Sequence, residues 1–282
     1  NPASGITTTT PVAMDFDANG NAPFTFTYAD AGQVSLRASK TIGGAPLSGA
    51  TNRFVVRPAG FTISGIRQTA SPGLVNPGAS GTGGAKFVAA GEAFTATVTA
   101  VTSTGTPTPN FGREALPEGV VLAPTLVAPS SGTLGALANT AIAGGSFNVG
   151  VATATNLSYS EVGIATIAAS IADGDYLGAG NASGAASATI GRFVPARFAL
   201  SAASLTHRAA AACSPASTFT YLGENFTLAF TLEAQNAAGA ITRNYRGGFA
   251  KFDPTVASAY ALVGRDGTTM FDTALARLSL GT

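Results

Sequence analysis

The sequence predicts an all-β protein made of tandem sandwich repeats, and two observations carry this prediction. Apolar and small polar residues alternate with a period of two along much of the chain, which is the pattern of half-buried strands. Two motifs also recur after 131–137 residues, which indicates that one structural unit is repeated.

The first motif consists of a strand, a corner and a second strand. Residues 24–28 read FTFTY, so we expect a strand there. Asp30-Ala31-Gly32 then predicts a turn, because Asp can bond the backbone downstream of it and Gly can adopt a positive φ. Alternation resumes over 34–38. This order is typical of the late strands of immunoglobulin-like sandwiches. The chain has no Trp and one Cys, so an antibody-type domain is excluded.

The same motif returns later in the chain. FTYADAGQVSLRAS at 26–39 matches LSYSEVGIATIAAS at 157–170. A last strand follows each copy and ends at a proline, in RFVVRP at 53–58 and RFVP at 192–195. Each proline is followed by a new expected strand, over Phe61–Ser64 and Phe198–Ser201.

The second motif belongs to the other half of the repeat. GEAFT at 91–95 recurs as GENFT at 223–227, and Asn110-Phe111 recurs as Asn244-Tyr245. Each of the first pair begins an alternating strand with one apolar face. The apolar positions are Phe94, Ala96, Val98 and Ala100 in one strand, and Phe226, Leu228, Phe230 and Leu232 in the other.

These repeats predict three segments. Residues 1–57 form the C-terminal half of an immunoglobulin-like sandwich, 58–197 a complete sandwich, and 198–282 the N-terminal half of another. Three explanations stay open for the halves: a window of a longer array, closure of the halves on each other within one chain, or completion by the next molecule in a head-to-tail filament. The joints at 57–60 and 195–197 are short, which disfavours closure within the chain.

Composition favours a secreted or surface protein over a cytosolic enzyme. Charged residues make up 10% of the chain, against about 25% in ordinary globular domains. The surface must therefore consist mostly of Thr, Ser, Asn, Gly and Ala. The net charge is +1, and the lysines are Lys40, Lys86 and Lys251, so we expect no nucleic-acid partner.

Three further features concern export and cross-linking. No charge occurs between Glu118 and Glu161, but Pro124, Pro129 and several glycines interrupt this stretch, so no transmembrane segment is predicted. The chain lacks an initiator Met and a signal peptide, which indicates a mature or internal segment. Cys213 is the sole cysteine and is either a buried apolar residue or the partner of a cysteine outside this segment.

The residues offer little catalytic chemistry. His207 is the only histidine, lies in an expected loop after a strand, and has no nucleophile motif near it, so we predict no catalytic residues and no enzyme activity. One His and one Cys exclude an ordinary zinc site within the chain, and we predict no cofactor. The remaining metal candidates are calcium ligands at Asp173 and Asp175. Residues 15–20, DFDANG, resemble a calcium loop but lack its twelfth-position Glu, which favours a turn between two strands.

Five segments of the chain are distinctive together: FVVRPAGF, PNFGRE, LSYSEVGIATIAASIADGDYLGAG, GRFVPARFALS and FTYLGENFTLAFTLEAQNAAGAITRNYRGGFAK. In these segments the chain resembles the MshQ family, which is encoded with the mannose-sensitive-haemagglutinin type IV pilus system of Gram-negative bacteria. The resemblance covers most of the chain and lies in the family's large C-terminal region. It implies an exported, multidomain surface or pilus-associated protein without enzymatic activity. The family often has paired cysteines early in a unit, whereas Cys213 stands alone.

These observations favour a non-enzymatic extracellular structural protein, as the stalk or subunit of a bacterial surface filament or pilus-associated assembly. We expect its partners to be copies of itself, neighbouring repeats of a longer chain, or pilus components. We expect it outside the cell or on the outer surface of a Gram-negative bacterium. The alternative is an adhesin or carbohydrate-binding module of a large surface protein.

Overall fold

The computed structural model describes residues 12–70, 73–207, 219–221, 224, 226–253, 264–266 and 269–271. The chain divides into two compact units, Asn1–Tyr245 and Arg246–Thr282. The second unit contains a one-turn 3₁₀ helix, η2 (Gly247–Phe249), and an antiparallel pair, β15 (Gly264–Asp266) and β16 (Thr269–Phe271). No helix in the described part of the chain is long and apolar enough to cross a membrane.

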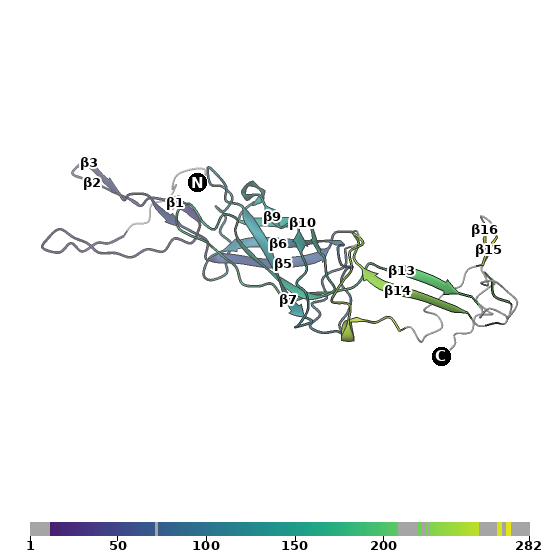
Figure 1. Cartoon of the computed structure of the whole chain (residues 1–282). Helices are drawn as coiled ribbons and strands as arrows, with labels where there is room; N and C mark the ends of the chain where they lie inside the picture. Colours follow the sequence, from purple (N-terminus) through teal and green to yellow (C-terminus); the bar gives the residue numbers. More distant parts are fainter. Residues whose placement is uncertain are drawn as a thin grey trace. The chain divides into compact units, whose positions relative to one another are not determined.

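The centre of the first unit is a sandwich of two four-stranded antiparallel sheets (Figure 1), which confirms the predicted all-β fold. The strand orders are β5-β6-β10-β8 and β12-β11-β7-β9. The strands of the first sheet are β5 (Gly60–Gln68), β6 (Ala93–Val101), β10 (Val151–Tyr159) and β8 (Leu137–Ala138). Those of the second are β12 (Ile190–Phe193), β11 (Gly163–Ile171), β7 (Val120–Ala128) and β9 (Ala141–Ile142), and η1 (Gly144–Ser146) follows β9.

The core of the sandwich follows from the alternation in the sequence. In β6 every second residue from Phe94 to Ala100 is buried, as predicted, because successive side chains of a strand point to opposite faces. Two aromatic clusters fill the space between the sheets. One comprises Phe87, Phe94, Tyr159 and Phe193, and the other comprises Phe61, Phe111, Phe147 and Tyr176.

The N-terminal region contains two small antiparallel sheets. β1 (Gly32–Val34) pairs with β4 (Phe54–Val56), and β2 (Arg37–Ile42) pairs with β3 (Ala45–Ala50). The β2–β3 hairpin turns at two glycines, which have φ values of 58° and 85°. Positive φ at both central positions is the geometry of a type I′ turn.

The prediction of a strand over residues 24–28 is wrong, because these residues form no hydrogen-bonded strand in the described chain. Their counterparts at the end of β10 pair with β6 on one side and with β8 on the other. No described strand lies beside 24–28 in this way. Alternation specifies which face a strand would bury, but a strand also needs a hydrogen-bonding neighbour.

The C-terminal part of the first unit contains one long antiparallel pair, β13 (Arg197–Thr206) and β14 (Thr227–Gln235). This pair reproduces β5 and β6. The register of β5–β6 shifts between Ser64 and Arg67, and that of β13–β14 shifts between Ser201 and Ser204, which are the equivalent positions 137 residues later. The predicted repeat therefore extends to the position of a β-bulge.

Candidate functional sites: two domain joints and a polar groove

The first joint connects the N-terminal corner to the central sandwich. The Asp30 carboxylate accepts a hydrogen bond from the Ala31 N–H through Oδ1, at 2.8 Å. The same oxygen accepts from the N–H of Asn110, 80 residues away, at 3.0 Å. The Asn110 side-chain amide donates to the Tyr28 hydroxyl at 3.3 Å, and the Arg57 guanidinium donates to the carbonyl of Asn181. The corner motif and the loop after β6 are thus held together by polar contacts.

The second joint connects the central sandwich to the loop after β14. Glu161, between β10 and β11, is buried, and its Oε2 accepts from the N–H groups of Val162 and Asn244, each at 3.2 Å. Its Oε1 accepts from the N–H of Arg243 at 2.9 Å. A carboxylate is a stronger acceptor than a neutral carbonyl, and these three N–H groups satisfy the buried side chain.

Asn244 is fully buried in the second joint, and its side-chain amide is satisfied by partners from the central sandwich. Its Oδ1 accepts from the N–H of Thr133 at 2.8 Å. Its Nδ2 donates to the carbonyls of Thr133 and Val162, at 2.8 and 3.1 Å. Asn236 adds a bond from its Nδ2 to the carbonyl of Ser160, at 3.1 Å. Buried polar groups that are paired in this way fix a geometry, because an unpaired one would be costly.

The buried Tyr176 stacks on Phe111 in the loop after β6, and Glu114 and Glu118 lie in the same loop. Tyr176 donates its hydroxyl hydrogen to Oε1 of Glu114, whose Oε2 accepts from the N–H of Gly112 at 2.8 Å. Burial raises the pKa of Tyr176 far above its ordinary value, and the hydrogen bond to Glu114 raises it further. Burial also raises the pKa of Glu118, with the charge of Asp173 as the next cause.

A polar groove lies along one edge of the central sandwich. β8 pairs with β10 and β9 pairs with β7, so the chain changes sheets between these two short strands. In the described pairing, β8 meets β10 only at Ser158 and Tyr159, which leaves a groove of about 630 Å³ beside the rest of β10. Its lining residues are Asn139, Thr140, Ala141, Ile142, Ala143, Ser146, Thr153, Ala154, Thr155 and Asn156.

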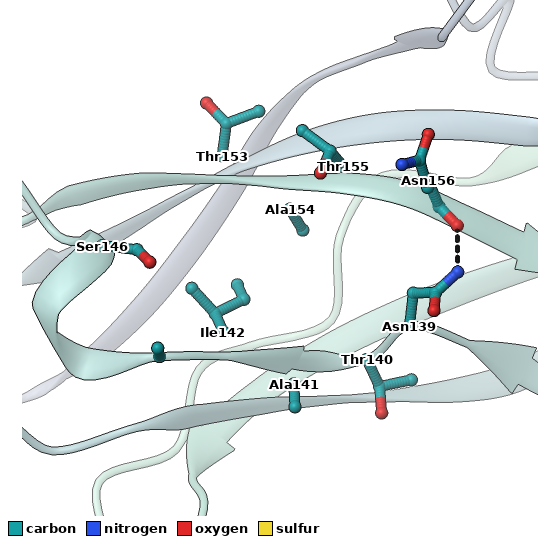
Figure 2. A pocket seen from close by; sticks show the side chains of 10 residues that line it. Asn139, Thr140, Ala141, Ile142, Ser146, Thr153, Ala154, Thr155 and Asn156 are labelled. Atoms are coloured by element: carbon teal, nitrogen blue, oxygen red, sulfur yellow. Dashed lines mark hydrogen bonds between the residues drawn. The ribbon is translucent and has the colours of Figure 1, made fainter.

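The groove presents hydroxyl and amide groups around an apolar floor. Figure 2 shows the amide of Asn139 directed at the backbone oxygen of Asn156, and this bond is 2.7 Å long. Thr153 and Thr155 project from β10, whereas Ile142 is buried beneath them. The lining contains no aromatic and no charged side chain, so the groove offers hydrogen bonds but no stacking platform.

The calcium candidates Asp173 and Asp175 lie in the loop after β11, where their carboxylates bind backbone groups. Oδ1 of Asp173 accepts from the N–H of Asp175 at 3.0 Å. The two oxygens of Asp175 accept from the N–H groups of Gly180 and Gly178, at 2.6 and 2.9 Å. Within the described residues, no group of three or more His, Cys, Asp or Glu side chains is placed to hold a metal ion.

The remaining candidate residues from the sequence lie in loops or outside the described residues. Asp17 caps a turn, accepting from the N–H groups of Asn19 and Asn21 at 2.9 and 2.8 Å, and these bonds lower its pKa. The predicted turn is therefore present, although no described strand flanks it. His207 directly follows β13, and its Nδ1 lies 3.1 Å from the Thr220 hydroxyl. Cys213 lies outside the described residues.

The joint residues are visible in the sequence as repeats, but their contacts across the joints are not. Asp30 and Glu161 occupy the same position of the corner motif, and Asn110 and Asn244 the same position of the second motif. That the two motifs contact each other across a joint follows only from the fold. The groove gave no signal, because two-residue strands are too short to show a period.

Comparison with known proteins places most of the chain in one family. The model of the first, immunoglobulin-like domain of DUF6701, a domain of unknown function, matches residues 1–51. The models of the second and third DUF6701 domains match residues 57–158 and 161–281. The limit between the last two falls between β10 and β11, inside the central sandwich. No curated protein and no solved structure matched the chain. The chain therefore belongs to the DUF6701 family, and its fold is a tandem array of immunoglobulin-like sandwich units.

Proposed function

We propose that the chain is a non-enzymatic structural protein of the outer surface of a Gram-negative bacterium, where it serves as the stalk or subunit of a pilus-associated filament. Its resemblance to the MshQ family supports this role, as do its low charge and its tandem sandwich units. Membership in a family with an immunoglobulin-like first domain is compatible with it.

The observation that carries the proposal is an exposed apolar face on the β13–β14 sheet. Phe198 is 41% exposed, whereas its counterpart Phe61 in β5 is 2% exposed. Leu200 and Leu228 on the same sheet are 66% and 54% exposed. In the central sandwich the second sheet covers the equivalent face. An apolar sheet face of this kind favours association, because burial removes the face from water.

A second copy of the chain carries suitable elements to cover this face. By the sequence repeat, β1 and β4 correspond to β11 and β12, which belong to the covering sheet of the central sandwich. We therefore place residues 1–57 of one molecule against residues 198–282 of the next, with main-chain β pairing across the junction. Such a heterologous contact does not close on itself and generates a filament.

The test is assembly of the full chain, measured by sedimentation velocity and by negative-stain imaging with mass per unit length. We expect filaments whose mass per axial repeat equals one chain of 27.8 kDa. The double variant Leu200→Thr/Leu228→Thr should lower assembly at least tenfold. Leu116→Thr/Leu134→Thr is the matched control, since these leucines are 82% and 53% exposed on the central sandwich, and it should assemble normally.

Single particles at all concentrations would overturn self-completion. The covering strands would then belong to further repeats of a longer chain, and the stalk role would have to be tested on that chain. Normal assembly of the Leu200→Thr/Leu228→Thr variant would show that the apolar face is not the contact.

The second candidate is an adhesin or carbohydrate-binding module, and the polar groove beside β10 is the observation that favours it. Its threonine hydroxyls and asparagine amides could bind sugar hydroxyls. A glycan array would test this with the full chain and with Thr153→Val/Thr155→Val, which removes two hydroxyls at nearly constant volume. Glycan binding that the double variant loses would support this function, and background binding by both would reject it.

A further inference from the structure

We propose that Asp30 and Glu161 are two copies of one connector, in which the acidic residue at the late-strand corner of a sandwich binds the asparagine–aromatic loop of the following sandwich. The partner that this surface fits is thus another DUF6701 sandwich bearing that loop. The proposal does not depend on filament formation, because both joints lie within one chain.

The two acidic residues occupy equivalent corners. Each accepts a hydrogen bond from the N–H of its own following residue, Ala31 in one case and Val162 in the other. Each is followed after one further residue by a glycine with an unusual backbone, at φ 131° for Gly32 and φ 134° for Gly163. Two stretches 131 residues apart therefore share the local geometry that aims the carboxylate.

The two loops that the carboxylates bind are also equivalent. Thr108 donates its N–H to the carbonyl of Ala100 at 2.9 Å, and Thr242 donates to Ala234 at 2.8 Å. Isolated bridges fix the same turn, Val101 with Pro107 and Gln235 with Ile241. Asn110 and Asn244 lie two residues after these threonines, and both are buried.

The aromatic residue after each asparagine anchors its loop in the same way. Phe111 packs edge-on against Phe61 with ring centroids 5.4 Å apart. Tyr245 packs edge-on against Phe198 at 5.5 Å. In both cases the partner ring belongs to the first strand of the following sandwich, so the loop is held by its own unit as well as by the corner.

The linker between units adopts the same connection at both joints. Ala59 donates its N–H to the carbonyl of Val101 at 2.9 Å. Ala196 donates to the carbonyl of Gln235 at 2.8 Å. Carboxylate, loop and linker thus repeat together, which would not be expected if either joint were an incidental contact.

The acidic side chains of the two joints differ in length, and this difference allows the connector to be tested. Asp30 accepts one N–H from the following unit, that of Asn110. Glu161 has one more methylene and accepts two, from Arg243 and Asn244. The longer acid thus reaches one more backbone donor of the loop.

The experiment is hydrogen exchange of single amides in the full chain, followed by NMR. In Glu161→Ala, we expect exchange at Arg243 and Asn244 to become at least tenfold faster. In Asp30→Ala, exchange at Asn110 should accelerate to a similar extent. Each variant is the control for the other, because the opposite joint should be unchanged, and the amide of Val98 in β6 should stay protected in both.

A conservative variant separates the connector from a general structural role. Glu161→Asp should keep one of the two loop amides protected, as Asp30 does at the first joint. The proposal is overturned if the loop amides stay protected in the alanine variants. It is equally overturned if protection of Val98 is lost together with theirs, or if Glu161→Asp behaves as Glu161→Ala.

Discussion

Ala202 in β13 occupies the bulge position that Gly65 occupies in β5, and both have positive φ values, 50° and 61°. A residue with a Cβ is strained in this region by about 1–2 kcal/mol, whereas glycine is not. Ala202→Gly should therefore stabilise the β13–β14 sheet by about 1 kcal/mol. Slower hydrogen exchange at the amide of Leu232 would measure this gain.

The neighbouring Ala203→Gly variant is the control for this prediction. Ala203 is not among the residues with positive φ, so glycine there only adds freedom to the unfolded chain. It should destabilise the sheet by about 0.5–1 kcal/mol. Destabilisation by both variants would mean that the bulge does not strain Ala202.

Gly163 and Gly32 give a second matched pair, with the same backbone and different surroundings. A Cβ at Gly163 would lie 2.3 Å from the carbonyl oxygen of Ala128, whereas a Cβ at Gly32 would meet no described atom within 4 Å. Gly32→Ala should cost about 1–3 kcal/mol from backbone strain alone. Gly163→Ala should cost clearly more, because the β7–β11 ladder must also shift. Urea unfolding followed by tyrosine fluorescence would compare them, and equal costs would contradict the prediction.

Tyr176 should make the stability of the sandwich fall with rising pH in the alkaline range. Burial, and then Glu114, raises the pKa of Tyr176 above its ordinary value. Above pH 10 the unfolded chain releases this proton while the folded chain retains it, so the free energy of unfolding falls as pH rises. The expected slope is about 1.4 kcal/mol per pH unit for this group. Urea unfolding at pH 8–11 would measure it.

Tyr176→Phe should remove this slope and also lower stability near neutral pH. The neutral-pH cost is about 1–3 kcal/mol, because Glu114 loses its hydroxyl donor and stays buried. Burial also raises the pKa of Tyr159, so Tyr159→Phe should remove a second, separate contribution. An unchanged alkaline slope in both variants would show that neither phenol is coupled to folding.

Strands β5, β6 and β12 of the central sandwich could be predicted because their information is local. Alternation in β6 determines which face is buried, and Pro195 ends the strand that precedes it. Residues 24–28 are the exception. They alternate as clearly as β6, yet they form no strand among the described residues, since pairing depends on segments far away in the sequence.

The joints could be predicted only in part, for a related reason. The sequence repeats the acidic corner and the asparagine loop, but the partners Asp30 and Asn110 are 80 residues apart, and Glu161 and Asn244 are 83 apart. Nothing in a single repeat says that the corner of one unit meets the loop of the next. The similar separation of the two pairs was the available signal, because a contact that repeats with the unit must keep its spacing.

Thr108 and Thr242 occupy equivalent positions but differ in their hydrogen bonds. The Thr242 hydroxyl donates to the carbonyl of Ala234 at 3.0 Å. The Thr108 hydroxyl is buried and has no hydrogen-bond partner among the described residues. Valine has nearly the same shape, so Thr242→Val should cost about 1 kcal/mol for the lost bond. Thr108→Val should be neutral or stabilising by about 1 kcal/mol, because it removes an unsatisfied buried polar group.

Hydrogen exchange of β6 and β14 amides would measure these two substitutions, each in its own unit. Thr242→Val should lower the stability of its unit, whereas Thr108→Val should leave its unit unchanged or more stable. If Thr108→Val destabilised its unit as much as Thr242→Val, the Thr108 hydroxyl would have to bind a partner such as a buried water. In that case the two loops would be equivalent in their polar contacts as well as in their backbone.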